Sequence, residues 1–230
     1  LASDGMENPL LLDVDQHADY LKRLKKGKYE FKKGQWILNE PIVIDGDLNI
    51  PSGVRIKFSK NSYLVVKGTL TALGVENEPI ILEPLSGSWK GVYVLKGDKR
   101  SRLKYVVIQN ITSLENGLLK LTGGVTFYKS DVDLENVKIE GVEAEDAINI
   151  VESSFTLKSV KISNTASDGL DADFSQGTVS QSKFSNIGGD ALDFSGSNIE
   201  IDKVEAINVK DKAVSGGENS MISIKNSNFN

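Results

Sequence analysis

Three aspartates in the second half of the chain have the residue type and the spacing to do chemistry. Asp171 and Asp173 stand two residues apart in the segment DGLDADFS, and Asp193 stands in the similar segment DALDFSGS, which begins 22 residues later. Aspartate is disfavoured in the middle of a strand, so its presence there needs a reason. Paired carboxylates can bind a cation, or act as acid and base on a glycosidic bond.

Two series of residues indicate that the surrounding chain repeats with a period near 22 residues. Aspartate begins a unit at four positions separated by 22, 22 and 21 residues: Asp146, Asp168, Asp190 and Asp211. A second marker closes a strand in each unit at intervals of 23, 22 and 22 residues: Gly141, Asn164, Asn186 and Asn208. Two independent markers with one period predict a solenoid of short strands, in which the four aspartates bind backbone N–H groups at turns.

Alternation along each strand predicts which side chains face solvent. If Leu170, Ala172 and Phe174 point inward, Asp171 and Asp173 point outward. Asp193 occupies the equivalent outward position on the next unit. Since units stack at the strand separation of about 4.8 Å, the carboxylates of Asp171 and Asp193 should lie about 5 Å apart. Two like charges at that distance raise one pKa unless a cation lies between them.

The residues around these aspartates allow three interpretations of the outer face. Asn149 on the previous unit and Ser195 on the next would add neutral oxygen ligands, and a set of oxygen ligands with Asp171 and Asp193 suits Ca²⁺. The second interpretation is a catalytic set formed by Asp171, Asp173 and Asp193. The third is a solvated acidic face without a ligand.

Aromatic residues are expected on the same sheet. Tyr93 and Tyr128 could stack against sugar rings, with Trp89 close to them. Alternatively, Trp89 fills a turn and the tyrosines only cover the sheet. A stacked aromatic core is expected from four phenylalanines: Phe155, Phe174, Phe184 and Phe194.

The repeat resembles the right-handed parallel β-helices of the pectate-lyase-like superfamily, of the bacterial surface and secreted type. The resemblance is carried by the aspartate and asparagine series and by IPSGVRIKFSKNSYLVVKGTLTALG, followed by EPIILEP and SWKGVYV. It implies an all-β solenoid over residues 35–230 with about eight or nine coils. It also implies a ladder of stacked amides at Asn164, Asn186 and Asn208, beginning after Gly141.

The resemblance does not imply one activity, because the superfamily includes lyases, hydrolases, epimerases, adhesins and inert stalks. The only histidine is His17, outside the coils, so no coil offers a histidine base. Elimination on such a fold needs a lysine or arginine base, and Lys161 and Lys183 are expected on a different strand of the coil from Asp171. Whether the chain is an enzyme stays open.

Residues 1–34 are expected to form a lead-in and a short helix that caps the first coil. Asp13 or Asp15 would begin this helix, which would run to about Lys26 with Gly27 just past its end. Tyr20, Leu21 and Leu24 would form its apolar face. Because the last coil reaches Asn230 without a cap, and a bare coil exposes strand edges, we expect a larger chain or assembly.

Composition excludes several classes of protein. A net charge of −5 argues against a nucleic-acid binder, and the absence of cysteine excludes disulfides and cysteine-ligated metals. No apolar run is long enough for a transmembrane segment. The sequence requires no cofactor, and Ca²⁺ is its one candidate.

The leading functional hypothesis is an exported bacterial module, secreted or on the cell surface. It would contact polysaccharide through the acidic outer face of one parallel sheet. The alternatives are a polysaccharide lyase or glycoside hydrolase that uses Asp171, Asp173 and Asp193, and a structural stalk or adhesin segment without a ligand.

Overall fold

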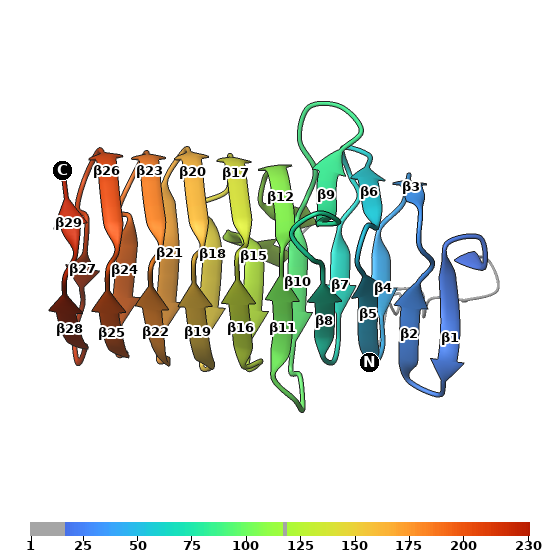
Figure 1. Ribbon diagram of the computed structural model, residues 1–230, viewed down its shortest axis with the longest axis horizontal. Helices are drawn as coiled ribbons and strands as arrows, with labels where there is room; N and C mark the ends of the chain where they lie inside the picture. Colours follow the sequence, from blue (N-terminus) through green and yellow to red (C-terminus); the bar gives the residue numbers. More distant parts are fainter. Residues whose placement is uncertain (1–16, 117–118) are drawn as a thin grey trace, which may run out of the picture.

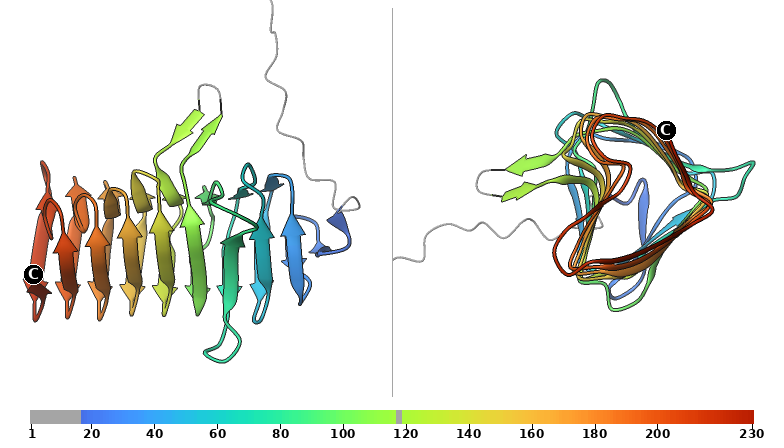
Figure 2. Two further views of the ribbon diagram at one scale, coloured as in Figure 1. Left: turned by 90° about the horizontal axis from the view of Figure 1, so that it is seen from above. Right: turned by 90° about the vertical axis from the view of Figure 1, so that its left-hand side faces the viewer.

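The computed structural model describes residues 17–116 and 119–230, which form a parallel β-solenoid with its coils stacked along one axis (Figure 1). Three sheets of ten, eight and nine strands run along the solenoid. Seen down the axis, they enclose a three-sided cross-section (Figure 2). The all-β class and the predicted eight or nine coils are confirmed by these strand numbers.

Each sheet takes one strand from each successive coil. Sheet A contains β1 (Leu21–Lys25), β2 (Lys28–Phe31), β5 (Asp47–Pro51), β8 (Leu70–Leu73), β11 (Ser101–Lys104), β16 (Val132–Glu135), β19 (Ser154–Lys158), β22 (Gln176–Ser180), β25 (Asn198–Asp202) and β28 (Met221–Lys225). Sheet B contains β3 (Gln35–Leu38), β6 (Arg55–Phe58), β9 (Ile80–Pro84), β12 (Val106–Ile111), β17 (Lys138–Val142), β20 (Lys161–Thr165), β23 (Lys183–Ile187), β26 (Glu205–Val209) and β29 (Asn228–Phe229).

Sheet C contains β4 (Ile42–Ile44), β7 (Leu64–Val66), β10 (Val92–Leu95), β15 (Gly123–Tyr128), β18 (Asp146–Val151), β21 (Asp168–Asp173), β24 (Leu192–Ser195) and β27 (Ser215–Gly216). A separate hairpin of β13 (Leu114–Asn116) and β14 (Leu119–Leu121) leaves the solenoid between β12 and β15 (Figure 2).

Aliphatic ladders fill the interior because the repeat keeps equivalent positions in register from coil to coil. On sheet C, Ile148 pairs with Leu170, which pairs with Leu192, and all three are fully buried. Alternate side chains along each strand face the interior, so a period of two along the strand becomes one continuous core along the axis.

The predicted asparagine ladder is confirmed. The side-chain amide of Asn186 donates to Oδ1 of Asn164 at 2.9 Å, and the amide of Asn208 donates to Oδ1 of Asn186 at 2.7 Å. All three residues have a left-handed backbone with φ between 55 and 57°, a conformation that asparagine tolerates better than most residues. At the same corner, a Cβ on Gly141 would lie 2.2 Å from Oδ1 of Asn110, so glycine leaves room for that amide.

Replacing Asn186 with alanine should lower the free energy of unfolding by about 1–3 kcal/mol, because two ladder hydrogen bonds are lost and alanine is strained at this φ. Asn186→Gly removes the same hydrogen bonds without the strain, so it should be less harmful than Asn186→Ala. Urea denaturation of both variants measures the two contributions. Equal stability of Asn186→Ala and the wild type would contradict a stabilising ladder.

The predicted N-terminal helix is wrong for its described part. Leu21–Lys25 is strand β1, which pairs antiparallel with β2, and Gly27 lies at φ 68° in the turn between them. Leu24, expected on an apolar helix face, is 54% exposed. As a strand, β2 pairs with β5 on one side and with β1 on the other. Its backbone N–H and C=O groups therefore find partners on both sides, which favours a hairpin over a helix here. Positions 13–16 of the expected helix lie outside the described residues.

The hairpin nevertheless covers the end of the core, which is the role expected of the helix. Leu21 and Phe31 are buried, and the ring of Tyr20 stacks on that of Phe31 at 5.8 Å between centroids. No helix in residues 17–116 and 119–230 is long and apolar enough to cross a membrane.

At the other end, residues 215–229 form β27, β28 and β29, which add one more strand to each sheet. These three strands pair with the preceding coil, so residues 210–230 continue the solenoid and do not cap it. A larger chain or assembly stays a prediction.

Candidate functional site

The outer face of sheet C presents the predicted aspartates in two rows that run along the solenoid. The first row contains Thr126, Asn149, Asp171, Asp193 and Ser215 on successive coils. The second row contains Tyr128, Val151, Asp173 and Ser195. The outward direction predicted for the three aspartates is therefore confirmed, and Ser195 lies beside Asp173.

Asn149 connects the first row to Asp146, which was expected only to bind a backbone N–H group at a turn. Its amide Nδ2 lies 2.9 Å from Oδ2 of Asp171 and 3.4 Å from Oδ2 of Asp146. Asp146 is only 3% exposed. We define Asp146, Asp171, Asp173 and Asp193 as the aspartate cluster.

Burial and like charges raise the pKa values of this cluster. Burial raises the pKa of Asp171 to about 8, with further increases from the charges of Asp146, Asp173 and Asp193, and the hydrogen bond from Asn149 offsets part of this. Burial also raises the pKa of Asp146 to about 7 and is the main cause of the raised pKa of Asp173. At neutral pH the cluster therefore holds protonated carboxyl groups, which can donate protons.

The structural interpretation of the unit-starting aspartates is confirmed for two of the four. Oδ1 of Asp168 accepts the backbone N–H of Asp190 at 2.8 Å, and Oδ1 of Asp190 accepts the backbone N–H of Lys212 at 2.7 Å. Asp211 is exposed and forms an ion pair with Lys212 at 3.1 Å.

Asp146 differs from its equivalents because the backbone N–H of Asp168 bonds to the carbonyl of Glu145, which leaves the Asp146 side chain without that partner. The sequence signal that could have identified it is Asn149, three residues later, where the next two units have aspartate.

The two tyrosines predicted to contact a ligand lie in different environments. Tyr93 points away from the core but is fully buried, since it packs with Val65 and Leu114 beneath the β13–β14 hairpin. The expectation that Tyr93 is available to a ligand is therefore wrong: its hydroxyl donates to the carbonyl of Lys90 at 2.6 Å. Tyr128 is half-buried on the outer face, in the same row as Asp173 and two coils before it.

Trp89 lies in the interior, so it is not part of an exposed aromatic surface, and the alternative in which it only fills a turn understated its burial. It is fully buried, and its ring stacks on Phe58 with 3.9 Å between centroids and 5° between planes. Its indole N–H donates to the carbonyl of Gln109 at 2.9 Å.

The predicted phenylalanine core is confirmed for Phe155, Phe184 and Phe194, which are buried, but it is wrong for Phe174, which is 69% exposed. Phe174 follows the last residue of β21 and has a left-handed backbone with φ 50°. This conformation ends the alternation of the strand and turns the chain toward sheet A, so the side chain does not reach the core.

The donor set as placed does not fit Ca²⁺, which takes six to eight oxygen ligands. Within residues 17–116 and 119–230, no group of three or more histidine, cysteine, aspartate or glutamate side chains is arranged to hold a metal ion. Of the predicted set, Asn149 turns its amide Nδ2 and not its oxygen toward Asp171, which leaves Asp171, Asp193 and Ser195 as the oxygen donors.

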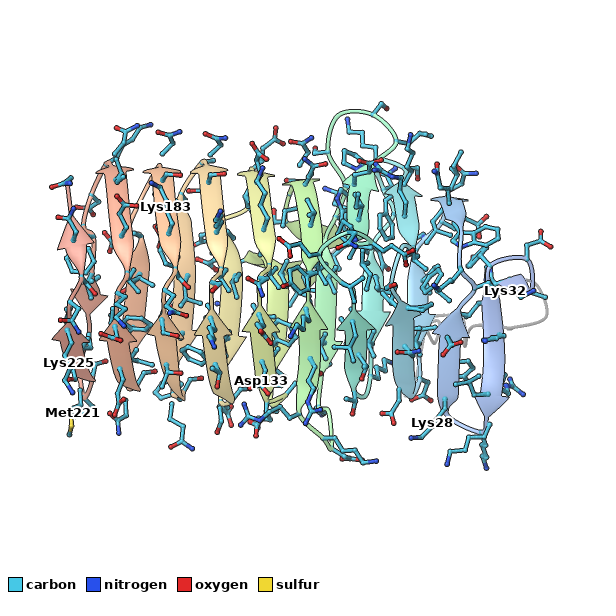
Figure 3. The ribbon with its side chains drawn as sticks, viewed as in Figure 1. Lys28, Lys32, Asp133, Lys183, Met221 and Lys225 are labelled. Atoms are coloured by element: carbon cyan, nitrogen blue, oxygen red, sulfur yellow. The ribbon has the colours of Figure 1, made fainter. Side chains whose placement is uncertain are left out.

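The lysines considered as bases for elimination lie on a different sheet from the aspartate cluster. Lys161 begins β20 and Lys183 begins β23, both in sheet B (Figure 3 labels Lys183). Lys183 also forms an ion pair with Glu205 at 2.8 Å. This arrangement does not bring either lysine to the carboxylates.

Comparison with known proteins places the chain in a family. Residues 100–230, more than half of the chain, match the family described as pectate lyase. The chain belongs to the pectate lyase family. The matched region of this pectate lyase family member contains the whole aspartate cluster. No curated protein matches it.

Two solved structures share the solenoid fold with this member of the pectate lyase family. One is the catalytic domain of GH87 α-1,3-glucanase in complex with nigerose, with a TM-score of 0.58 and 19% identity, covering 79% of this chain and 34% of that one. The other is the D1069A variant of that catalytic domain with tetrasaccharides, with a TM-score of 0.56 and 16% identity, covering 80% of this chain and 34% of the other. The chain therefore spans about a third of the length of these structures.

Proposed function

We propose that this protein hydrolyses glycosidic bonds in a polysaccharide that lies across the outer face of sheet C. The observation that carries the proposal is the position of Asp171 in the aspartate cluster. Burial and three neighbouring aspartates raise its pKa to about 8, so it carries a proton at neutral pH. Membership of the pectate lyase family and the fold shared with an α-1,3-glucanase support a polysaccharide as the substrate.

In this mechanism Asp171 is the general acid. Its hydrogen bond with Asn149 occupies one carboxyl oxygen at 2.9 Å, which leaves the other free to hold the proton. The proton passes to the glycosidic oxygen as the bond between that oxygen and the anomeric carbon breaks. The charge of Asp193 on the next coil helps to keep Asp171 protonated before this step.

Asp173 activates the water that completes the reaction. It accepts a proton from water as the water oxygen bonds to the anomeric carbon. Asp173 then releases this proton to solvent, and Asp171 takes up a proton from solvent. Asp171 and Asp173 lie two residues apart on one strand, a Cα separation of about 6.6–6.8 Å. Because Asp173 acts here as a base on water and not as a nucleophile, the water displaces the leaving group in one step, and we expect inversion at the anomeric carbon.

The test is a panel of neutral glucans and polygalacturonate. Hydrolysis produces new reducing ends without the ultraviolet absorbance of an unsaturated sugar, whereas elimination produces that absorbance. Asp173→Asn should lower the rate about 10²–10⁴-fold because it removes the general base. Asp98 is an exposed aspartate in a loop after β10, and the control variant Asp98→Asn should leave the rate unchanged. Unsaturated products, or an unchanged rate in Asp173→Asn, would contradict the proposal.

The pH profile provides a second readout. Because the charge of Asp193 helps to raise the pKa of Asp171, Asp193→Asn should move the alkaline limit of activity to lower pH. NMR of the first product would establish whether the anomeric configuration is inverted. Secretion or location on the cell surface, where polysaccharide is abundant, remains part of this proposal.

A further inference from the structure

An open groove of about 460 Å³ runs along the corner between sheets C and A, beside the aspartate cluster. One wall comes from residues that follow β18, β21 and β24 in sheet C, and the other from the first residues of β19, β22, β25 and β28 in sheet A. Phe174 lines this corner groove and directly follows Asp173. We propose that the corner groove binds sugar residues of a neutral polysaccharide.

Phe174 is the first reason for this assignment. The corner requires a left-handed backbone on successive coils, and the equivalent positions are Lys129 at φ 50° and Glu152 at φ 48°. Long charged side chains suit such an exposed position, but a phenylalanine that is 69% exposed does not stabilise the core. Its ring is instead available to a ligand in the groove.

Gly196 on the next coil supports the ring. A Cβ at Gly196 would lie 2.7 Å from Cδ1 and 3.0 Å from Cε1 of Phe174, so the edge of the ring occupies the space of a missing side chain. The ring therefore packs against the backbone of Gly196, and this contact limits the positions that the ring adopts without a ligand. A preordered aromatic surface loses less conformational entropy on binding.

The remaining lining combines apolar and polar groups in the way a sugar requires. Met221 at the start of β28 is 70% exposed, and it projects from the C-terminal end of the solenoid (Figure 3). Between Phe174 and Met221 lie the amide side chains of Gln176 and Asn198, and Nε2 of Gln176 is held by Oγ of Ser154 at 3.0 Å. A sugar ring has an apolar C–H face and a rim of hydroxyl groups, which match these two kinds of surface.

The charge of the groove favours a neutral chain over a polyuronate. Its lining contains two acidic residues, Asp131 and Glu152, and no lysine or arginine. The nearby cations are already paired: Lys129 lies 3.1 Å from Glu152, and Arg100 lies 3.4 Å from Asp131. A polyanion in the groove would lie close to Asp131, Glu152 and the aspartate cluster, and no cation in the lining would compensate the charge. Contacts between like charges oppose binding.

The inference deepens the proposed function and rests on it for the direction of the sugar chain, from Asp171 toward Phe174. Three residues of extended chain span about 10 Å, so a polysaccharide bound at the aspartates can continue into the corner groove.

The test measures binding separately from hydrolysis. Calorimetry with short linear gluco-oligosaccharides of several linkages is carried out on Asp171→Asn, which leaves the sugars uncleaved. Adding Phe174→Ala should lower the affinity about three- to tenfold, the loss expected for one aromatic contact. Gly196→Ala should also lower the affinity, because the new Cβ displaces the Phe174 ring although the ring itself is still present. Leu73→Ala, which removes an exposed apolar side chain on β8 away from the groove, is the matched control and should bind normally.

Three results would overturn the inference: unchanged affinity in Phe174→Ala, tighter binding of oligogalacturonate than of every neutral probe, or no neutral probe bound. Self-association of the wild type that Phe174→Ala abolishes, measured by sedimentation, would identify a second copy of the chain as the occupant and would also overturn it. Binding without hydrolysis of the same neutral glycans by the wild type would support the groove while contradicting the proposed function.

Discussion

Asp171→Asn should raise the free energy of unfolding by about 3–5 kcal/mol at about pH 9, because asparagine has no charge to bury. The folded protein raises the pKa of Asp171 to about 8, mainly by burial and then by the charges of Asp146, Asp173 and Asp193. In the unfolded chain the value returns to about 3.9. Each pKa unit corresponds to about 1.4 kcal/mol, and the range allows for relaxation of the coupled carboxyl groups.

The direction of the pH dependence follows from the raised pKa. The neutral carboxyl is favoured in the folded state, so its stabilising contribution is fully present below about pH 4 and is lost as the pH rises through about 8. The advantage of Asp171→Asn over the wild type should therefore grow between these values and vanish in acid. Urea denaturation across this range measures it.

Asp98→Asn is the control for this experiment, because it makes the same replacement at an exposed carboxyl outside the aspartate cluster. A constant difference between Asp171→Asn and the wild type would contradict the burial of this carboxyl. Under the proposed function, Asp171→Asn also removes the general acid. The more stable protein should then be the inactive one, as expected where a site keeps an unfavourable group for chemistry.

Trp89→Ala should lower the free energy of unfolding by about 3–5 kcal/mol. The indole is fully buried, stacks on Phe58 at 3.9 Å, and donates a hydrogen bond to the carbonyl of Gln109. Its removal leaves a cavity in the middle of a solenoid in which each coil depends on its neighbours. Urea denaturation followed by far-ultraviolet circular dichroism is the measurement.

Trp89→Phe and Trp36→Ala are the matched controls. Phenylalanine keeps the ring contact with Phe58 but loses the N–H donor, so it should cost less than alanine. Trp36, the second tryptophan, is only half-buried near the N-terminal hairpin, so its removal should also cost less. A loss below about 1 kcal/mol in Trp89→Ala would contradict a core role for the stack.

The sequence by itself determined the solenoid and the position of the three aspartates within it. Asp171 and Asp193 could be placed on the outer face because strand alternation and a constant period are properties of the backbone and need no knowledge of other contacts. The asparagine ladder was expected from the resemblance to the pectate-lyase-like β-helices, and the constant period of Asn164, Asn186 and Asn208 agreed with it.

Only the tertiary structure decided which of these outer positions are buried and which are open. Asp146 and Asp168 begin equivalent units, but the carboxyl of Asp146 lies 3.4 Å from the amide of Asn149, whereas that of Asp168 accepts the backbone N–H of Asp190. Tyr93 lies outside the core and is still buried, because a hairpin inserted elsewhere in the chain folds over it. Phe174 left the core because a left-handed corner redirects the chain. Burial, pKa values and corner conformations depend on residues from different coils, and no local pattern in the sequence contains that information.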